Sequence, residues 1–309
     1  MVLLSGGVGG ARLGRGLAGL LGRALTVVVN VGDDDLIHGL EVSPDLDTVL
    51  YTLARWEGPH GWGVAGDSFQ VMGHLAALGS DISFRIGDRD LATNLRRTDL
   101  LRRGAPLSAV TARLAEALGV TARVLPATDD RLRTRVQTAD GIWRSFQEYF
   151  VRRGHQDEVR DVRFPGASSA KPAPGVTEAI ERAALVVVGP SNPPLSVWPI
   201  LAVAGVGEAL VRAPRVVGVS PLVGGKAVKG PADRVLRSLG FPAGNAGVIA
   251  AYDGLLHELW IDESDRAEQA ALEELGCRIR VAPTRIADPG DAEALAARLL
   301  AQGDAQGDN

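Results

Sequence analysis

The chain has a single cysteine, no long apolar run and no excess of basic residues. Cys277 has no second cysteine with which to form an internal disulfide or a thiolate metal site, which is typical of a reducing compartment. No apolar run approaches the about 18 residues of a membrane span, and no basic segment precedes the first apolar strand pattern. A net charge of −4 does not suit the basic face of a nucleic-acid-binding protein. We therefore expect a cytoplasmic protein that binds neither membranes nor nucleic acid.

Short apolar runs alternate with helical patterns over most of the 309 residues. Val2–Leu4 and Thr26–Asn30 are apolar runs separated by a helical pattern from about Ala11 to Leu21. This alternation is typical of a parallel sheet that is covered by helices. The same alternation resumes later in the chain, with predicted strand cores at Leu185–Val188, Val216–Val219, Leu259–Ile261 and, as an edge strand, Arg278–Val281.

The middle of the chain has a different pattern. Thr134–Thr138 and Ile142–Tyr149 flank Ala139–Gly141, a good hairpin turn, and Val159–Phe164 alternates apolar and polar residues. We therefore expect a small antiparallel insertion at residues 123–172. The core then comprises residues 1–122 and 173–301, and the polar segment 302–309 forms a frayed tail.

A glycine-rich segment follows the first predicted strand. Gly6, Gly7, Gly9 and Gly10 lie between a strand and a helix, where backbone N–H groups and the helix N-terminus favour bound phosphate. No Gly-Lys-Ser/Thr follows, so the segment is not a P-loop. It is also a poor dinucleotide fingerprint, because Arg12 stands where a glycine is needed. We interpret it as a phosphate cradle; the alternative is a turn needed only for tight packing.

Four acidic residues follow the second predicted strand, at the carboxyl edge of the sheet, where open α/β sheets bind ligands. They are Asp33, Asp34, Asp45 and Asp47. Carboxylates beside a phosphate cradle suggest a Mg²⁺ ion between them. Because residues two apart on a helix do not share a face, at most one of Asp45 and Asp47 should be a direct ligand. Alternatively, the acids are a solvated loop and favourable charges in the first helical turn.

A third candidate segment is Gly87–Asp90, which follows the alternating apolar residues Ile82, Phe84 and Ile86 and is therefore expected at a strand end. Arg89 is suited to bind a carboxylate or phosphate with two hydrogen bonds. In the alternative, Asp90 caps the next helix and Arg89 pairs with Asp88.

Two further loops follow predicted strands. Gly189–Pro193 is stiffened by two prolines and would present Ser191 and Asn192 rigidly; an amide suits base recognition, although a tight turn explains the loop equally well. Gly224, Gly225 and Lys226 resemble a phosphate-binding arrangement, with Lys226 and Lys229 as candidate diphosphate partners.

Together these segments resemble the CofD-like 2-phospho-L-lactate transferases of coenzyme F420 biosynthesis. The resemblance extends over nearly the whole chain, from Ser5 to Ile261. Several long matches in the same order carry it: Val29–Asp34, Ser43–Leu53, Gly61–Gly63, Gly87–Thr93, Phe146–Phe150, Pro190–Pro193 and Lys229–Asp233.

The resemblance implies a Mg²⁺-dependent transferase with a Rossmann-like three-layer α/β/α core, a mostly parallel sheet and a smaller subdomain. Such an enzyme moves the phospho-acyl unit of a guanosine-diphosphate-activated three-carbon acid onto a ribityl hydroxyl of the deazaflavin Fo. The products are GMP and coenzyme F420-0 or its dehydro form. The family is usually dimeric, so a homodimer is expected. Whether the acid is phospholactate, phosphoenolpyruvate or phosphoglycerate is left open.

The resemblance also implies roles for individual residues. The glycine segment would hold the diphosphate, and Ser191, Asn192 and Pro193 would lie around guanine. The acids would hold Mg²⁺ and orient the attacking hydroxyl, with Asp34 and Asp47 catalytic. Gly61–Gly63, Asp88 and the catalytic Arg89 would line the Fo or acid side. The remaining substrate-binding residues are expected to be Asn30, Thr93, Gly224 and Lys226.

Two positions depart from the family pattern. Asn94 stands where we expect histidine, which puts an acid–base role there in doubt, and Trp198 stands where we expect glycine, which would narrow the nucleotide pocket. A related, non-catalytic family of nucleotide-sugar-binding regulators shares the glycine-rich start. An NAD-dependent oxidoreductase is disfavoured by Arg12 and Asn30.

Overall fold

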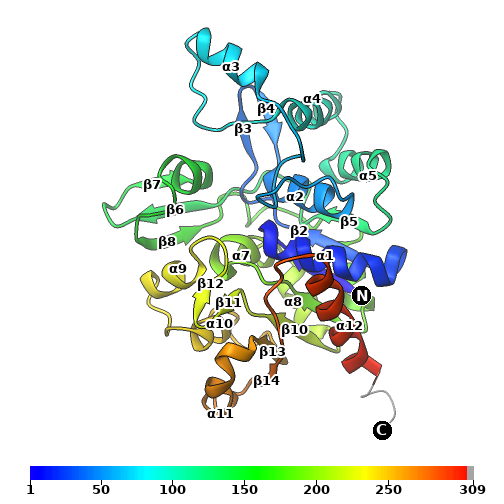
Figure 1. The fold of residues 1–309 in the computed structure, drawn as a ribbon, viewed down its shortest axis with the longest axis vertical. Helices are drawn as coiled ribbons and strands as arrows, with labels where there is room; N and C mark the ends of the chain where they lie inside the picture. The colour runs from blue at the N-terminus through cyan, green and yellow to red at the C-terminus, as the bar shows by residue number, and fades with distance from the viewer. Residues whose placement is uncertain (305–309) are drawn as a thin grey trace.

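A seven-stranded sheet forms the centre of the molecule (Figure 1). The structure is a computed structural model that describes residues 1–304. Every neighbouring pair in this sheet is parallel, and the strand order is β14-β13-β10-β9-β1-β2-β5. The strands are β1 (Val2–Ser5), β2 (Thr26–Val29), β5 (Arg123–Pro126), β9 (Val186–Val188), β10 (Val216–Val219), β13 (Glu258–Ile261) and β14 (Arg278–Val281).

The strand order reverses beside β1. The chain runs from β1 to β2 and β5 in one direction, then crosses to β9 on the other side of β1 and continues outward to β14. Leu3 of β1 is in register with Val27 of β2 and Val187 of β9. Since ligands of open parallel sheets bind where the order reverses, the carboxyl ends of β1 and β9 mark the expected binding crevice.

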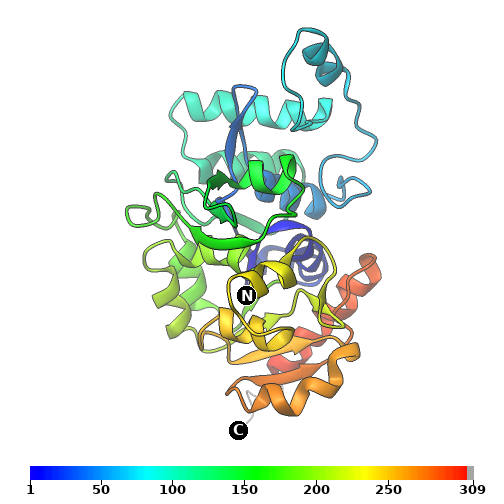
Figure 2. The same cartoon turned by 90° about the vertical axis from the view of Figure 1, so that its left-hand side faces the viewer.

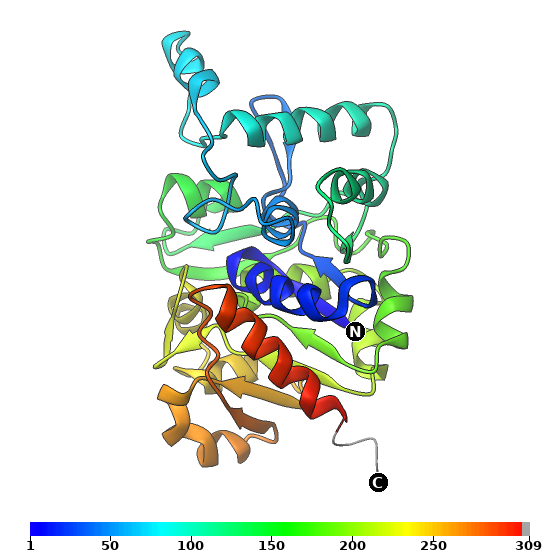
Figure 3. The ribbon, with the colours of Figure 1, turned by 45° about the vertical axis from the view of Figure 1, so that its right-hand side comes forward.

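Helices cover both faces of the sheet. Helix α1 packs against α2 and α12, and Figure 3 shows α12 running beside α1. Helix α6 packs against α8. The helices of the core are α1 (Gly7–Leu21), α2 (Pro44–Leu53), α5 (Leu107–Ala117), α6 (Val176–Arg182), α7 (Trp198–Leu201), α8 (Val206–Arg212), α9 (Ala232–Ser238), α10 (Asn245–Ala251), α11 (Gln269–Glu273) and α12 (Pro289–Asp304). Shorter helical turns are η1 (Gly22–Ala24), η2 (Glu148–Arg152), η3 (Pro193–Val197) and η4 (Glu263–Glu268).

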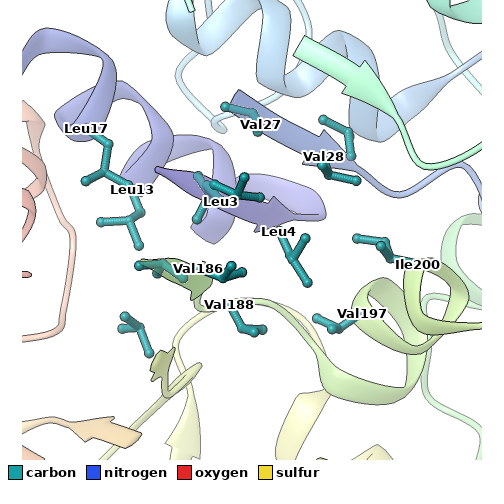
Figure 4. Close-up of a cluster of buried hydrophobic side chains, with 14 of the residues drawn as sticks. Leu3, Leu4, Leu13, Leu17, Val27, Val28, Val186, Val188, Val197 and Ile200 are labelled. Carbon is teal, nitrogen blue, oxygen red and sulfur yellow. The ribbon is translucent and has the colours of Figure 1, made fainter. Parts of the chain in front are cut away.

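The sheet is buried because its strands are apolar on both faces, as the parallel arrangement requires. Side chains from β1, β2 and β9 pack against α1 and the η3–α7 segment (Figure 4). The labelled members of this cluster are Leu3, Leu4, Leu13, Leu17, Val27, Val28, Val186, Val188, Val197 and Ile200, all at most 2% exposed. The expected three-layer α/β/α fold is confirmed.

A projection extends from the end of the molecule opposite β14 (Figures 1 and 2). It contains the hairpin β3 (Asp35–Ile37) and β4 (Leu40–Val42), with α3 (Gln70–Ala77) and α4 (Asp88–Arg102). The strand that we expected through residues 82–86 does not form. This segment is a loop that buries Ile86 against Val42 and Met72, so its alternating apolar residues reflect packing under α3.

A separate three-stranded antiparallel sheet has the order β7-β6-β8, formed by β6 (Arg135–Thr138), β7 (Trp143–Ser145) and β8 (Val159–Arg163). The expected start of the insertion at residue 123 is wrong, because Arg123–Pro126 is β5 of the parallel sheet and pairs with β2. The short apolar sequence of Arg123–Pro126 is equally consistent with a strand of the parallel sheet and with a strand of the antiparallel sheet. A small hairpin, β11 (Leu222–Val223) with β12 (Lys226–Ala227), follows β10.

At the C-terminus, α12 continues to Asp304, so the expected frayed tail at 302–309 is helical over its first residues; the rest lies outside the described residues. Within residues 1–304, no single helix is long and apolar enough to cross a membrane. Two neighbouring helical segments, Pro193–Leu201 and Val206–Arg212, reach the length and apolar composition of a membrane span only when they are taken together. The pair is bent by 90°.

Two glycines of α1 provide a matched test of its packing. A Cβ on Gly16 would lie 2.1 Å from the Ala292 carbonyl oxygen of α12, whereas a Cβ on Gly19 would meet nothing within 4 Å. We expect Gly16→Ala to lower the free energy of unfolding by about 1–3 kcal/mol through overpacking. Gly19→Ala should raise it by about 1 kcal/mol through helix propensity. Urea unfolding measures both, and equal effects of the two substitutions would contradict the close approach of α1 and α12.

Candidate active site

The glycine-rich turn and the Gly189–Pro193 loop lie at the carboxyl ends of β1 and β9 and pack directly on one another. A Cβ on Gly9 would lie 2.2 Å from the carbonyl oxygen of Pro190, and one on Gly10 would lie 2.4 Å from Ser5 Oγ. These two glycines are therefore required by packing. The close contact brings two predicted segments, more than 180 residues apart, into one crevice.

The loop after β9 is held in place by its polar side chains. Ser191 Oγ donates to the Gly6 carbonyl at 2.7 Å and accepts from Gly6 N at 3.3 Å. Asn192 caps η3, because its Oδ1 accepts from Leu195 N at 3.3 Å, and Pro193 begins that helical turn. Asn192 Nδ2 is buried and has no hydrogen-bond partner in the described chain. The loop thus holds one buried amide donor that is unpaired among the described residues.

The N-terminus of α1 faces a carboxylate. Gly7, whose φ is 65°, donates its N–H to Asp45 Oδ1 at 2.7 Å. A helix N-terminus favours a negative charge, so this contact stabilises the ionised Asp45. The first N–H of the turn is therefore already paired with a carboxylate of the protein, and the phosphate cradle stays a prediction.

Asn30 holds two of the acidic residues together. Its Nδ2 donates to Asp45 Oδ2 at 2.9 Å and to Asp33 Oδ1 at 3.4 Å, while its Oδ1 accepts from Gly32 N at 2.7 Å. Asn30 directly follows the last residue of β2, so its amide is fixed at the edge of the sheet. A single buried amide thereby brings the Asp33 and Asp45 carboxylates side by side.

The electrostatics of these carboxylates suit a cation. Burial, followed by the charges of Asp45 and Asp34, raises the pKa of Asp33 well above its ordinary value. Burial also raises the pKa of Asp45 to about 6, although hydrogen bonds from Asn30 and Gly7 oppose the shift. A divalent cation stabilises the ionised forms, and Mg²⁺ typically takes only one or two carboxylates with phosphate and water oxygens. Asp33 and Asp45 therefore fit Mg²⁺, although no group of three or more His, Cys, Asp or Glu suited to a metal occurs in the part of the chain that the structure describes.

Asp34 lies beside this pair but has a different environment. Ser43 Oγ donates to its Oδ2 at 2.8 Å, and its Oδ1 is buried without a partner among residues 1–304. Burial raises the pKa of Asp34 to about 7, against the opposing charge of Arg133. A carboxyl group with a pKa near neutrality and one free oxygen is suited to accept a proton.

Asp47 differs from the other acids because it pairs with a buried arginine. Arg97 of α4 donates to both carboxylate oxygens of Asp47, with Nη1 at 3.1 Å from Oδ2, and it is 1% exposed. The opposite directions of Asp45 and Asp47 follow from their spacing on α2. Of the two, Asp45 is the one placed to hold a metal ion with Asp33, since the oxygens of Asp47 are already paired.

Asn94 belongs to the same buried network. Its Oδ1 accepts from Arg97 Nη1 at 2.7 Å, and its Nδ2 donates to Asp90 Oδ1 at 3.1 Å. Tyr51 Oη also donates to Asp90 Oδ1, at 2.9 Å, and burial raises the pKa of Asp90 to about 7. Thr93, which directly precedes Asn94 on α4, is half-buried. Asn94 therefore links α4 to α2 through Arg97.

Asp88 and Arg89 have local structural contacts. The Asp88 carboxylate accepts from Gln70 N at 3.0 Å and Val71 N at 3.1 Å and so caps α3. Asp67 in turn accepts from Arg89 N and caps α4. The alternative in which Asp90 caps this helix is wrong, because Asp67 accepts from both Arg89 N and Asp90 N at the start of α4. The exposed Arg89 donates to the Ala65 carbonyl at 3.2 Å.

The second glycine pair lies in the β11–β12 hairpin. Gly224 donates its N–H to Ser264 Oγ at 2.9 Å and Asp265 Oδ2 at 3.1 Å, and Lys226 is exposed on β12. Lys229 instead contacts the loop at His60 and Gly61, because its Nζ donates to the His60 carbonyl and lies 3.5 Å from a Cβ built on Gly61.

The Gly61–Gly63 segment also reaches the turn. A Cβ on Gly61 would lie 2.5 Å from Val8 Cγ1 of α1. Trp62 is 55% exposed and stacks on His60, with ring centroids 5.7 Å apart. The structure thereby brings an exposed aromatic pair beside the start of α1.

Trp198 packs against the core. Its Nε1 donates to the Ala251 carbonyl at 2.8 Å, and its ring meets Phe241 edge-on at 5.8 Å. The large side chain is accommodated by α10, which accounts for a bulky residue at this position.

Sequence reasoning missed several residues of this site, namely Arg97, Arg133, Thr134 and, as a site residue, Gln147. Gln147 Nε2 donates to the Asp33 carbonyl at 2.7 Å and so fixes the acidic loop. Arg97 lies in the polar pattern of α4, where a buried arginine and an exposed one look alike. Of these residues, the sequence pointed only to Gln147, which lies in the Phe146–Phe150 match to the family.

Replacement of Asp34 should change the pH dependence of stability. The folded protein holds a proton on Asp34 up to about pH 7, whereas the unfolded chain loses it near its ordinary, lower pKa. The wild type therefore loses stability as pH rises from about 4 to 7. Asp34→Asn, measured by thermal unfolding with chelator present, should be nearly neutral at pH 4 and more stable than wild type at pH 8. A difference that is independent of pH would contradict a raised pKa.

The Arg97–Asp47 pair gives a second test. Arg97→Met leaves a buried, unpaired carboxylate and should lower the free energy of unfolding by about 3–5 kcal/mol. Arg96→Met is the matched control on the same helix, because Arg96 is exposed and forms an ion pair with Asp99 at the surface; it should change stability by about 0.5 kcal/mol or less. Urea unfolding that ranks the two variants equally would refute the burial of this pair.

Comparison with known proteins identifies the chain's relatives. The family model described as 2-phospho-L-lactate transferase CofD matches residues 1–284. A phosphoenolpyruvate transferase from Streptomyces griseus is 43% identical over 308 residues, covering 97% of each chain. A 2-phospho-L-lactate transferase from Methanosarcina mazei is 38% identical over 291 residues, covering 92% of this chain and 94% of the relative.

The fold has a solved counterpart. A crystal structure of a UPF0052 family protein from Bacillus halodurans superposes with a TM-score of 0.66 over 97% of this chain and 98% of the other, at 19% identity. At that identity the similarity concerns the fold alone. The family match and the identities to known transferases show that the chain belongs to the CofD family of 2-phospho-L-lactate transferases.

Proposed function

We propose that this protein transfers a phospho-acyl unit from a guanosine-diphosphate-activated three-carbon acid to the deazaflavin Fo, with Mg²⁺ as cofactor. The products are GMP and coenzyme F420-0 or its dehydro form. The names of the relatives, a phosphoenolpyruvate transferase and a 2-phospho-L-lactate transferase, support this class of reaction. The observation that carries it is the Asn30-bridged pair of Asp33 and Asp45 against the N–H of Gly7, where strand order reverses.

The residues at the crevice divide the work of such a transfer. Asp33 and Asp45 would hold Mg²⁺, which would neutralise charge on the phosphoryl oxygens. The turn from Gly6 to Gly10 binds the diphosphate at the N-terminus of α1. The unpaired Asn192 Nδ2 donates to a carbonyl of the guanine base.

Asp34 acts on the acceptor. Its free Oδ1 accepts a hydrogen bond from the attacking ribityl hydroxyl and takes the proton as the O–P bond forms. The bond between the transferred phosphorus and the bridging oxygen breaks, and GMP leaves with that oxygen. A covalent enzyme intermediate is not needed, because the donor and acceptor are held in line.

Substitution of the acids tests these assignments. Asp34→Asn should lower kcat by about 10²–10⁴-fold with little change in donor affinity, since it removes the proton acceptor but keeps the shape. Asp45→Asn should instead raise the Mg²⁺ concentration required for half-maximal rate. Asp99→Asn, on the exposed face of α4, is the control and should match wild type. Wild-type kinetics in both Asp34→Asn and Asp45→Asn would refute the proposed roles.

The function itself is tested by turnover with purified protein, Mg²⁺, Fo and each of the three guanylylated acids. Formation of a phospho-acyl Fo product and GMP is the expected result, and the ranking of the three donors identifies the acid. A protein that binds a nucleotide but neither binds nor modifies Fo would instead be a regulator of the nucleotide-binding type.

A further inference from the structure

The acidic loop, residues 31–34 after β2, is held in place by the antiparallel sheet. Two successive carbonyls of the loop accept hydrogen bonds from that part of the chain. Thr134, which directly precedes β6, donates its N–H to the Gly32 carbonyl at 2.6 Å. Gln147, two residues after β7, donates its Nε2 to the Asp33 carbonyl at 2.7 Å, across 114 residues of sequence. The backbone that carries Asp33 is therefore bound by a second sheet.

Gly32 is enclosed from two sides. A Cβ there would lie 2.4 Å from Thr134 Oγ1 and 2.9 Å from Pro199 Cβ of α7. Only a residue without a side chain fits between these two groups. The acidic loop thus passes through a close contact between the core and the antiparallel sheet, which fixes its path.

The two hydrogen bonds fix the direction of the Asp33 side chain. The Gly32 carbonyl belongs to the peptide plane before the Asp33 Cα, and the Asp33 carbonyl belongs to the plane after it. Because each peptide unit is planar, holding both planes fixes φ and ψ of Asp33 and hence its Cα–Cβ direction. The Asp33 carboxylate is thereby directed to Asn30, whose Nδ2 donates to Asp33 Oδ1 at 3.4 Å and to Asp45 Oδ2 at 2.9 Å.

Gln147 has the chemistry that this position requires. Its side chain is 9% exposed, and its hydrogen bond to Asp33 is buried, so water does not readily replace it. An amide donor is neutral and adds no positive charge that would compete with a bound cation. The segment that carries it is anchored by Phe146, whose ring stacks on Phe150 with centroids 5.1 Å apart.

We propose that Gln147 is a positioning residue for the metal site, which sets the cation affinity of Asp33 and Asp45 through the backbone of the acidic loop. The inference rests on the proposed function, in which these two carboxylates hold Mg²⁺. Since the loop is ordered before the ion binds, binding does not have to offset the entropy of ordering it. The antiparallel sheet is then part of the metal site without supplying a ligand.

Binding of Mn²⁺ tests the proposal without turnover. Mn²⁺ prefers the same oxygen ligands as Mg²⁺, and its free ion is counted by electron paramagnetic resonance. Gln147→Met keeps the shape of the side chain but removes the donor, and it should raise the dissociation constant for Mn²⁺ about tenfold. Gln147→Asn keeps an amide that is one methylene shorter, so its dissociation constant should lie between those of wild type and Gln147→Met.

Turnover supplies a second readout and Gln137 a matched control. The Mg²⁺ concentration for half-maximal rate should rise about tenfold in Gln147→Met, with kcat at saturating Mg²⁺ within about twofold of wild type. Gln137 Nε2 likewise donates to a carbonyl, that of Gly141 at 2.9 Å, but at the exposed hairpin between β6 and β7. Gln137→Met should therefore keep the wild-type Mn²⁺ affinity and Mg²⁺ requirement.

The outcomes separate this proposal from the proposed function. Wild-type Mn²⁺ affinity in Gln147→Met, or in Gln147→Asn if Gln147→Met does not fold, would overturn the positioning role and leave the proposed function intact. A lower kcat at saturating Mg²⁺ with unchanged Mn²⁺ affinity would also overturn it. Equal Mn²⁺ binding by wild type and Asp33→Asn would instead contradict the metal assignment of the proposed function and, with it, this inference.

Discussion

The site depends on the burial of carboxylates at the edge of a parallel sheet. Asp33, Asp34 and Asp45 are each at most 8% exposed, and burial is the largest cause of their raised pKa values. Removing negative charges from water is costly unless they are paired or bind a cation. The Asn30 amide and the N–H of Gly7 offset part of that cost. The part of the burial cost that these two groups do not offset is the physical reason to expect a positively charged ligand beside the carboxylates.

The two acids of α2 show how one helix supports both stability and chemistry. Asp45 faces the glycine turn and the other acids, while Asp47 faces α4 and pairs with Arg97. The pairing of Asp47 anchors the projection onto the core through a buried network that includes Asn94 and Asp90. Because this pairing satisfies both oxygens of Asp47 within the protein, Asp47 is not among the acids that we propose to hold the metal ion.

Predictions from the sequence were most reliable where a residue's role is local. The parallel strands follow from runs such as Thr26–Val29, whose side chains are apolar on both faces. Helix α2 begins at Pro44, directly after Ser43, as helices commonly do at a serine followed by proline. The alternating apolar residues at 82–86 led us to predict a strand that does not form. A loop that packs under α3 needs apolar side chains at the same spacing as a half-buried strand. Similarly, Arg123–Pro126 was placed in the wrong sheet, since a short apolar run carries no information about its partner.

By itself, the sequence determined the α/β class, the glycine turn at the end of β1, the acidic loop after β2 and, through its long matches, the family. These are properties of contiguous residues and their spacing. The tertiary structure alone decided which acids converge, because Asn30 bridges Asp33 and Asp45 while Arg97, fifty residues beyond Asp47, removes that acid from the group. It also decided that Thr134 contacts the acidic loop directly and that Arg133 lines one cavity together with that loop. Such contacts join segments far apart in the chain, and no local pattern encodes which of many polar side chains will meet once the sheet and helices have packed.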